Sequence, residues 1–249
     1  MSARVGHTMS DQPAQPRRRG PARFYGRRKG RPLHGGRAQA LTTLPEFGLP
    51  MPKDETGFTA EELVGPESIF GRAVDDLWLE IGFGNGEHTL HIADQYPDVG
   101  ILGFEPFMNG VASLLNHMHQ RAITNIRVFS DDARMLLPHF PEASAGRIYL
   151  QFPDPWPKTR HHNRRFLQTS TLDRFAHILR PGGELRLATD DPKLADWMME
   201  RTWRHHAFEW TAQQANDWRV PPADWTPTRY YEKAVKQGRV GYFMNFTRA

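Results

Sequence analysis

Short apolar runs alternate with amphipathic stretches along most of the chain, starting near residue 75. Runs of strand length are LWLEIGF (77–83), VGILGFE (99–105), NIRVFS (125–130), RIYLQF (147–152), ELRLAT (184–189) and GYFMNF (241–246). Stretches with helical spacing lie between them, at 87–96, 108–121, 164–180, 192–203 and 228–237, with a short helix after the third run. We expect the helix over 164–180 to stop at PGG (181–183), because proline and glycine disfavour helix. The alternation predicts an α/β fold with a doubly wound, mostly parallel sheet and helices on both faces.

The length and composition of the chain exclude several classes of protein. A chain of 249 residues is long enough for one large α/β domain or two small ones. No apolar run approaches the roughly 18 residues of a membrane span, and no signal-peptide core is recognisable near the start. Zero cysteines exclude disulfide frameworks, thiol nucleophiles and zinc sites built on thiolates. We therefore expect a soluble, cytoplasmic protein.

Basic residues are concentrated near the amino terminus. Residues 1–43 contain ten of the 32 Lys and Arg but one of the 28 Asp and Glu. Arg, Gly, Pro and Gln dominate this segment, which predicts a disordered, RNA-contacting tail ahead of a domain spanning 44–249. Its densest part mixes aromatic rings with cations suited to base stacking and phosphate contact: Phe24, Tyr25, Arg27, Arg28, Lys29 and Arg31. A solubilising tail without a partner is the alternative, and a start at Met9 would leave the basic part intact.

A glycine-rich turn follows the first predicted strand. In LEIGFGNGE, Gly82, Gly84 and Gly86 permit a sharp turn and the close approach of a ligand to the backbone. The helix that follows points its amino terminus at that ligand. Glu105 ends the second strand, where a carboxylate can accept hydrogen bonds from both hydroxyls of a ribose. The turn therefore indicates a nucleotide-like cofactor, with a tight turn that binds nothing as the alternative.

Two details favour S-adenosylmethionine over NAD as that cofactor. The spacing is G-x-G-x-G rather than G-x-G-x-x-G, and Glu80 lies two residues before the first glycine. S-adenosylmethionine carries a cationic amino group and a sulfonium, which a carboxylate attracts, whereas a pyrophosphate needs the helix terminus clear. After the third strand, Asp132 suits the adenine amine, with the Ala133 backbone N–H as a donor. Asp131 competes for this role, and either aspartate could instead cap the next helix.

The segment FPDPWPKTRHHNRR (152–165), after the fourth strand, is the most specific one. Ligands of a doubly wound sheet bind outside the carboxyl ends of its strands, so Asp154 is expected in the cleft between two prolines. Trp156 offers either a stacking face or a packing contact. The cations that follow are Lys158, Arg160, His161, His162, Arg164 and Arg165. They oppose the dipole of a helix start, which favours an external anion over a merely solvated surface, and no metal site is expected because the histidines lack further ligands at suitable spacing.

These segments, together with GFEP, DDA, LRPGGELRLATD and PTRYYEK in this order, resemble the bacterial tRNA (guanine-N7)-methyltransferase family. YGRRKGRPL also resembles the family's basic amino-terminal segment, so the resemblance runs from about residue 24 to the carboxyl terminus. It implies a seven-stranded, Rossmann-like methyltransferase sheet. It further implies methyl transfer from S-adenosylmethionine to N7 of a guanine in the tRNA variable loop, at position 46. The expected partner is tRNA, without membrane contact, and the chain is expected to be a monomer or a homodimer that uses no metal.

The residue pattern and the resemblance together assign expected roles by position. The methyl-donor pocket is expected to contain Glu80, Gly82, Gly84, Gly86, Glu105, Asp132, Ala133 and Asp154, with Asp154 also as the catalytic residue. The residues expected to bind the substrate are Lys158, Asp190, Thr228, Arg229, Tyr231 and Glu232. Those expected to contact the RNA backbone are Arg27, Arg28, Lys29, Arg160, Arg164 and Arg165.

The carboxyl-terminal motif departs from the family's pattern. The family has Thr-Arg/Lys-Tyr/Phe-Glu, whereas here Thr228, Arg229 and Tyr230 are followed by Tyr231, and the glutamate comes one place later at Glu232. A shift of one residue on a helix rotates a side chain by about 100°. Either Tyr231 or Glu232 could therefore fill the family's glutamate role.

Two other functions are compatible with these residues. The first is a methyltransferase of the same fold that acts on another RNA site or on a small molecule; the identity of the methylated nucleotide distinguishes it. The second is a non-catalytic RNA-binding relative, against which the four acids at 80, 105, 132 and 154 argue. Binding of the methyl donor distinguishes that one.

Overall fold

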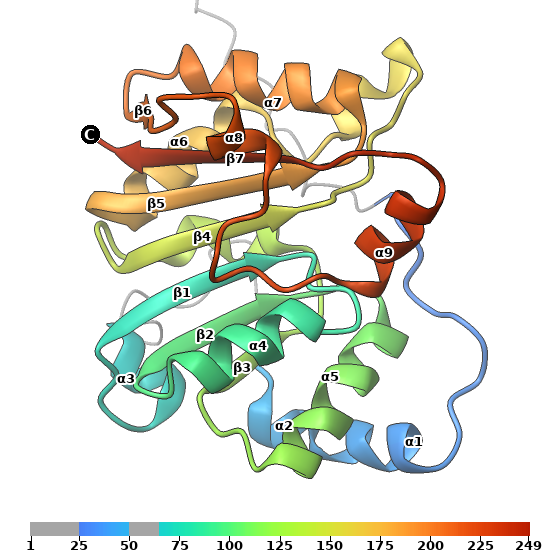
Figure 1. Ribbon diagram of the computed structural model, residues 1–249. Coiled ribbons are helices and arrows are strands. Elements are labelled where there is room, and N and C mark those ends of the chain that lie inside the picture. The colour runs from blue at the N-terminus through green and yellow to red at the C-terminus, as the bar shows by residue number, and fades with distance from the viewer. Residues whose placement is uncertain (1–24, 50–64) are drawn as a thin grey trace, which may run out of the picture.

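A seven-stranded sheet forms the centre of the computed structural model, which describes residues 25–49 and 65–249 (Figure 1). Its strands are β1 (Asp76–Ile81), β2 (Val99–Phe104), β3 (Ile126–Phe129), β4 (Ala145–Gln151), β5 (Leu179–Thr189), β6 (Phe208–Trp210) and β7 (Tyr242–Arg248). They lie in the order β3-β2-β1-β4-β5-β7-β6. β7 runs antiparallel to both of its neighbours, and the other four pairs are parallel. The expected doubly wound, mostly parallel sheet is confirmed; the short strand β6 is absent from the apolar runs noted above.

Helices cover both faces of the sheet. On one face lie α4 (Glu87–Gln95) and α5 (Met108–Arg121), with α1 (Gly36–Ala40), the 3-10 turn 41–43 and α2 (Leu44–Phe47) beside them. On the other lie α3 (Gly65–Phe70), α6 (Thr169–Ile178), α7 (Pro192–Trp203) and the 3-10 turns Ala133–Met135 and Leu137–His139. The carboxyl-terminal region adds α8 (Asn216–Arg219) and α9 (Arg229–Lys236). Within the two described ranges, no helix combines the length and the apolar composition that crossing a bilayer would need.

The alternation of side chains along β1 places the first candidate carboxylate. Leu77, Leu79 and Ile81 pack in the core beneath α6 and α7, and Trp78 packs in the core beneath α4 and α5. Successive strand residues point to opposite faces, so Glu80 shares the face of Trp78. Glu80 is consequently held against α4, at the carboxyl end of the strand.

The helix expected over 164–180 was wrong at both ends. Residues 159–164 form a 3-10 turn, and α6 begins only at Thr169, where the side chains of Gln168 and Thr171 form a reciprocal capping box. Leu179 already pairs with Ala145 of β4, and β5 continues through PGG (181–183). Gly182 takes a left-handed φ of 75°, which accommodates the irregular register there. Pairing across the sheet thus begins before the chain reaches the helix-breaking residues.

Residues 25–43 contact the first part of α5 and the turn before it. The Met108 backbone N–H donates to the Arg28 carbonyl, and the Asn109 amide bonds the backbone of both Gly30 and Arg31. α1 and the following 3-10 turn then pack against α5 (Figure 1). The expected boundary at residue 43 does not coincide with a break in the fold, and the part of the tail before Tyr25, with Phe24, lies outside the described residues.

Gly110, in the first turn of α5, provides a test of the packing around the glycine-rich turn. A Cβ at this position would lie 2.1 Å from the Gly84 carbonyl oxygen and 3.4 Å from Glu105 Cγ. Alanine ordinarily stabilises a helix by up to about 1 kcal/mol relative to glycine. We nevertheless expect Gly110→Ala to lower the melting temperature by several degrees, measured by differential scanning calorimetry, because the turn must shift. Gln120→Ala, at an exposed position on the same helix, should leave it unchanged or raise it; the same result for Gly110→Ala would refute this view of the packing.

Candidate active site

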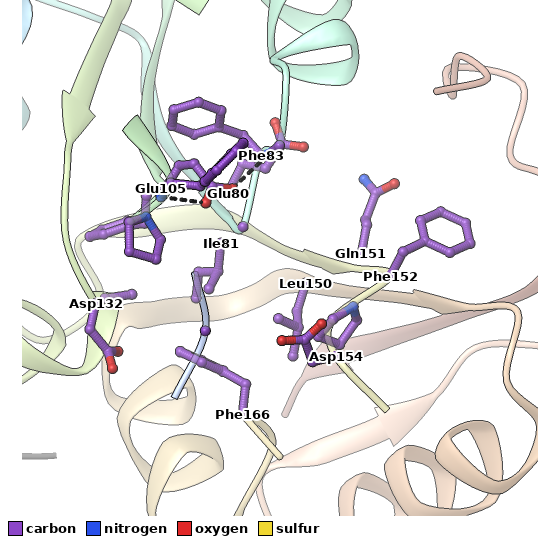
Figure 2. A pocket seen from close by; sticks show the side chains of 18 of the residues that line it. Glu80, Ile81, Phe83, Glu105, Asp132, Leu150, Gln151, Phe152, Asp154 and Phe166 are labelled. Atoms are coloured by element: carbon purple, nitrogen blue, oxygen red, sulfur yellow. Dashed lines mark hydrogen bonds between the residues drawn. The ribbon is translucent and has the colours of Figure 1, made fainter. Parts of the chain in front are cut away.

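A cavity of about 500 Å³ opens at the carboxyl ends of β1, β2 and β4 (Figure 2). Its wall is formed by the glycine-rich turn, by the segments that follow β2, β3 and β4, and by two more distant parts of the chain. These are residues 25–27, ahead of α1, and Thr228 and Tyr230, at the start of α9. The location agrees with the rule that doubly wound sheets bind ligands at the carboxyl ends of their strands.

The three glycines of the turn all adopt left-handed backbone conformations. The φ angles of Gly82, Gly84 and Gly86 are 78°, 60° and 86°, which a side chain would strain. Gly82 and Gly84 line the cavity, whereas Gly86 does not. Gly86 instead precedes α4, where a Cβ would lie 2.7 Å from the Leu114 side chain. The first two glycines therefore shape the cavity, and the third allows α4 to approach α5.

Glu105 joins the turns that follow β1 and β2. Its carboxylate accepts hydrogen bonds from the backbone N–H of Gly84 at 2.8 Å and of Phe107 at 2.9 Å. Burial raises the pKa of Glu105 to about 7; the two N–H groups act in the opposite direction, and the neighbouring carboxyls of Asp154 and Glu80 raise it further. Each carboxylate oxygen has another lone pair with which to accept a hydrogen bond from a ligand hydroxyl.

Glu80 begins a chain of contacts that leads out of the cavity. Its buried carboxylate accepts from Thr89 Oγ1 at 2.6 Å and lies 3.0 Å from His88 Nδ1. Gln151 Nε2 lies 3.2 Å from the other ring nitrogen of His88. Gln151 Oε1 accepts from Trp225 Nε1 at 2.6 Å. The cavity wall is thereby connected to the segment that leads into α9.

The two aspartates after β3 have different partners. Asp132 is buried and caps the following 3-10 turn, accepting from the Arg134 backbone N–H at 3.0 Å and pairing with its guanidinium at 2.6 Å. Asp131 accepts two bonds of 2.7 Å from Arg28. Burial acts to raise the pKa of Asp131, but Arg28 and the Asp132 backbone N–H hold it below its usual value. Both aspartates and Ala133 line the cavity, so the capping contact of Asp132 coexists with a place in its wall.

Strained backbone on both sides of residues 153–155 presents Asp154 to the cavity. Phe152 and Trp156 have φ angles of 48° and 42°, which cost about 1–3 kcal/mol each. The ring of Phe152 is held by aromatic contacts at centroid distances between 5.6 and 6.4 Å, with Trp225, Tyr230, Tyr231 and Phe243. Asp154 is exposed at the cavity mouth, on the side away from Glu80 and Glu105 (Figure 2), and the surrounding walls desolvate its carboxyl and raise its pKa.

The residues of the carboxyl-terminal motif, at the start of α9, point in different directions. Thr228 Oγ1 accepts from the Tyr231 backbone N–H at 3.2 Å and caps the helix. Thr228 and Tyr230 line the cavity, whereas Tyr231 packs against Trp225 and Phe243. Arg229 and Glu232 are exposed and lie outside this cavity.

Asp190 is buried beneath α9 rather than on the cavity wall. Its carboxylate forms an ion pair with Arg239 and accepts from the Tyr230 hydroxyl at 3.3 Å. Tyr230 was not among the expected site residues, and it connects Asp190 with the cavity.

The expected RNA-contacting cations differ in exposure and in the groups they contact. Arg27, which lines the cavity, Lys29 and Arg160 are exposed, as is Lys158, which was expected to bind the substrate. Arg28 is exposed as well, but its guanidinium pairs with Asp131. Arg164 is half-buried and lies over the rings of Tyr25 and Trp156, at 4.6 and 5.0 Å.

Arg165 does not fit the expected phosphate contact. Its side chain is 2% exposed, its Nε donates to the Pro155 carbonyl, and its guanidinium lies 4.8 Å from the Trp197 ring. The 3-10 turn before it directs this last arginine into the protein, where it supports the segment that carries Asp154. The spacing of the cations along the chain contains no sign of this.

Comparison with known proteins identifies the family. A family model described as "Putative methyltransferase" matches residues 75–244. The tRNA (guanine-N(7)-)-methyltransferase of Rhodospirillum rubrum is 46% identical over 228 residues, covering 91% of this chain and 88% of that protein. That of Azorhizobium caulinodans is 43% identical, covering 90% and 94%. The chain belongs to the tRNA (guanine-N(7)-)-methyltransferase family.

Solved structures agree on the fold of this family member. The aminoglycoside resistance methyltransferase NpmB1 has a TM-score of 0.51 at 15% identity, covering 80% of this chain and 98% of that one. The 16S rRNA methyltransferase KamB also scores 0.51, at 14% identity and the same coverage. At such low identity these likenesses support the Rossmann-like methyltransferase fold alone.

The raised pKa of Glu105 predicts how the stability of this methyltransferase changes with pH. The folded protein retains a proton up to about pH 7 that the unfolded chain releases near 4.5. The free energy of unfolding should therefore fall as pH rises across this interval, by on the order of 3 kcal/mol. Glu105→Gln cannot ionise there and should lack this contribution. Urea unfolding of both proteins at pH 4.5, 6 and 8 measures it, and parallel pH profiles would contradict the assignment.

Proposed function

We propose that this protein transfers a methyl group from S-adenosylmethionine to N7 of a guanine in the variable loop of tRNA, at position 46. The observation that carries the proposal is an acid-lined cavity behind a G-x-G-x-G turn, in a chain 46% identical to a protein named for this reaction. A cytoplasmic location belongs to the same proposal, because tRNA is the substrate.

The lining of the cavity fits the methyl donor better than a phosphate-bearing cofactor. Glu80, Glu105, Asp131, Asp132 and Asp154 all line it, an arrangement that attracts an ammonium or sulfonium and repels a pyrophosphate. We assign Glu105 to the ribose hydroxyls and the region of Asp132 and Ala133 to the adenine. The bound donor supplies an electrophilic methyl group on its sulfonium. The protein's own residues hold this group and aim it.

Guanine N7 has an in-plane lone pair, so the reaction needs no general base. The N7–methyl bond forms as the methyl–sulfur bond breaks, and the positive charge moves from sulfur to the purine ring. Catalysis is then largely alignment of three atoms, together with a fixed negative charge near the base. We assign that charge to Asp154, whose ionised carboxylate can also accept hydrogen bonds from guanine N1–H and the exocyclic amine.

Residues at the cavity mouth are the proposed contacts of the tRNA. Thr228 and Tyr230 share that mouth with Asp154, and Asp190 acts on the substrate through Tyr230. Extracting the guanine from its tertiary pairing costs a few kcal/mol, which phosphate contacts can offset. The proposed phosphate-contacting side chains are the accessible cations on either side of the cavity: Arg27, Lys29, Lys158 and Arg160.

The test of the reaction is methyl transfer from labelled S-adenosylmethionine to unmodified tRNA transcripts, followed by borohydride–aniline cleavage. We expect strand scission at one guanine of the variable loop. Label incorporation without scission would refute transfer to N7. No incorporation into any tRNA, with the donor still bound, would refute tRNA as the substrate.

Replacing the proposed catalytic carboxylate separates its role from that of the fold. Asp154→Asn keeps the shape of the side chain and removes its charge, so we expect kcat to fall by about 10²- to 10³-fold. The melting temperature, measured calorimetrically, should change little. Asp98→Asn, at an exposed turn before β2, is the matched control and should retain wild-type turnover. A kcat for Asp154→Asn within a few-fold of the control would overturn the assignment.

A further inference from the structure

A second cavity, of about 400 Å³, lies between α4 and α5, with α1 at one side. We call it the α4–α5 groove. Asn85 and Glu87 line both this groove and the candidate active site, so the two cavities share a wall. Thr226 and Arg229, which precede and begin α9, complete its rim. Of the residues that line the groove, Arg229 alone was expected from the sequence to bind the substrate.

The groove contains hydrogen-bond donors that the protein does not satisfy. Within residues 25–49 and 65–249, no partner is found for the side chains of Arg37, Asn85 and His91. His117 Nδ1 lies 2.8 Å from the Ser113 carbonyl, which leaves its other ring nitrogen available. These donors line one groove and have no partners among the described residues, so they suit a ligand that is rich in acceptor oxygens.

The charges of the groove also favour an anion. Its two carboxylates are already paired, Asp94 with Arg121 at 2.7 Å and Glu87 with Arg229 at 3.6 Å. Arg37 is exposed and has no such partner in the part of the chain described here. Three arginines thus face two carboxylates, and the unbalanced charge is positive.

The topology places the groove opposite the other cationic segment. Residues 158–164 follow β4 and lead into α6 on one face of the sheet, whereas α4 and α5 cover the other face. The candidate active site lies between them, at the carboxyl edge of the sheet. An RNA strand that inserts one base there continues on both sides of that base. One side of the strand then passes the cations of residues 158–164, and the other side passes the groove.

We propose that the α4–α5 groove binds a phosphodiester of the substrate RNA strand, next to the methylated guanine. The proposal rests on the proposed function, because it takes the inserted base as its starting point. Arg37 and His91 contact the phosphate oxygens, and Asn85, on the shared wall, donates at the point where the strand leaves the active site. The groove extends the RNA-binding surface to a face that the distribution of cations along the chain does not indicate.

Salt dependence of tRNA binding tests the proposal directly. We compare full-length wild-type protein, the double variant Arg37→Ala/His91→Ala, and the control Arg204→Ala, whose exposed side chain lies at the end of α7 on the opposite face. The slope of log Kd against log salt concentration should fall by about one for each phosphate that the variant no longer neutralises. It should fall in the double variant and not in the control. The Kd for S-adenosylmethionine should stay within two-fold of wild type in both, and kcat should do so in Arg204→Ala.

The outcomes separate this proposal from the function on which it rests. A wild-type slope in the double variant, from a protein that methylates tRNA, overturns the groove as a phosphate site and leaves the proposed function standing. An equal decrease of the slope in the double variant and in Arg204→Ala also overturns it, since the effect would then be nonspecific. Wild-type protein that binds tRNA but methylates none overturns the proposed function instead.

The chain contains no cysteine, so a single introduced thiol can be labelled specifically. A photoactivatable aryl azide attached to His91→Cys should cross-link to nucleotides adjoining the methylated guanine, mapped by primer extension. The same reagent on Arg204→Cys should give no defined cross-link. Cross-links from residue 91 at distant nucleotides, or none above the control, would refute the placement of the strand.

Discussion

The hydrogen bonds of the Glu105 carboxylate to Gly84 and Phe107 are the constraint around which the candidate active site is arranged. They hold together two turns that follow neighbouring parallel strands, and they require the backbone of the first turn to approach closely. Left-handed glycines make that approach possible, and Gly110 leaves room for it at the start of α5. Burial of the carboxyl in this packing raises its pKa to about 7, although the two hydrogen bonds themselves lower it.

The opposite wall of the cavity depends on aromatic packing instead. Phe152 has a strained φ angle, and its ring lies among those of Trp225, Tyr231 and Phe243, which come from the last part of the chain. The hydrogen bond from Trp225 to Gln151 ties that part back to β4 and, through His88, to Glu80. The carboxyl-terminal segment thus helps to fix the position of Asp154 and also brings Tyr230 to the same cavity. Residues separated by most of the chain thereby form one continuous wall of the cavity.

Much of this arrangement follows from local pattern. Apolar runs locate six of the seven strands to within a few residues, because burial between two helical layers requires them. The glycine spacing and the acids at 80, 105, 132 and 154 come together at one edge because parallel strands end at the same edge. The three-residue strand β6 and the start of β5 cannot be predicted from local pattern. β6 is a strand because it pairs with β7, and β5 begins before the helix-breaking residues because Leu179 pairs with Ala145.

The sequence by itself determined the fold class, the family and the set of acids around the cavity, since each depends on residue type and short-range spacing. Only the tertiary structure decided which of several neighbouring residues points into the protein, into the cavity or to solvent. Arg165 turns inward while Arg160 stays accessible, and Tyr230 reaches the cavity while Tyr231 packs behind it. The contacts of residues 25–43 with α5 likewise have no counterpart in the composition of that segment. The physical reason is that helix phase and chain-distant contacts, rather than composition, set the direction of a side chain.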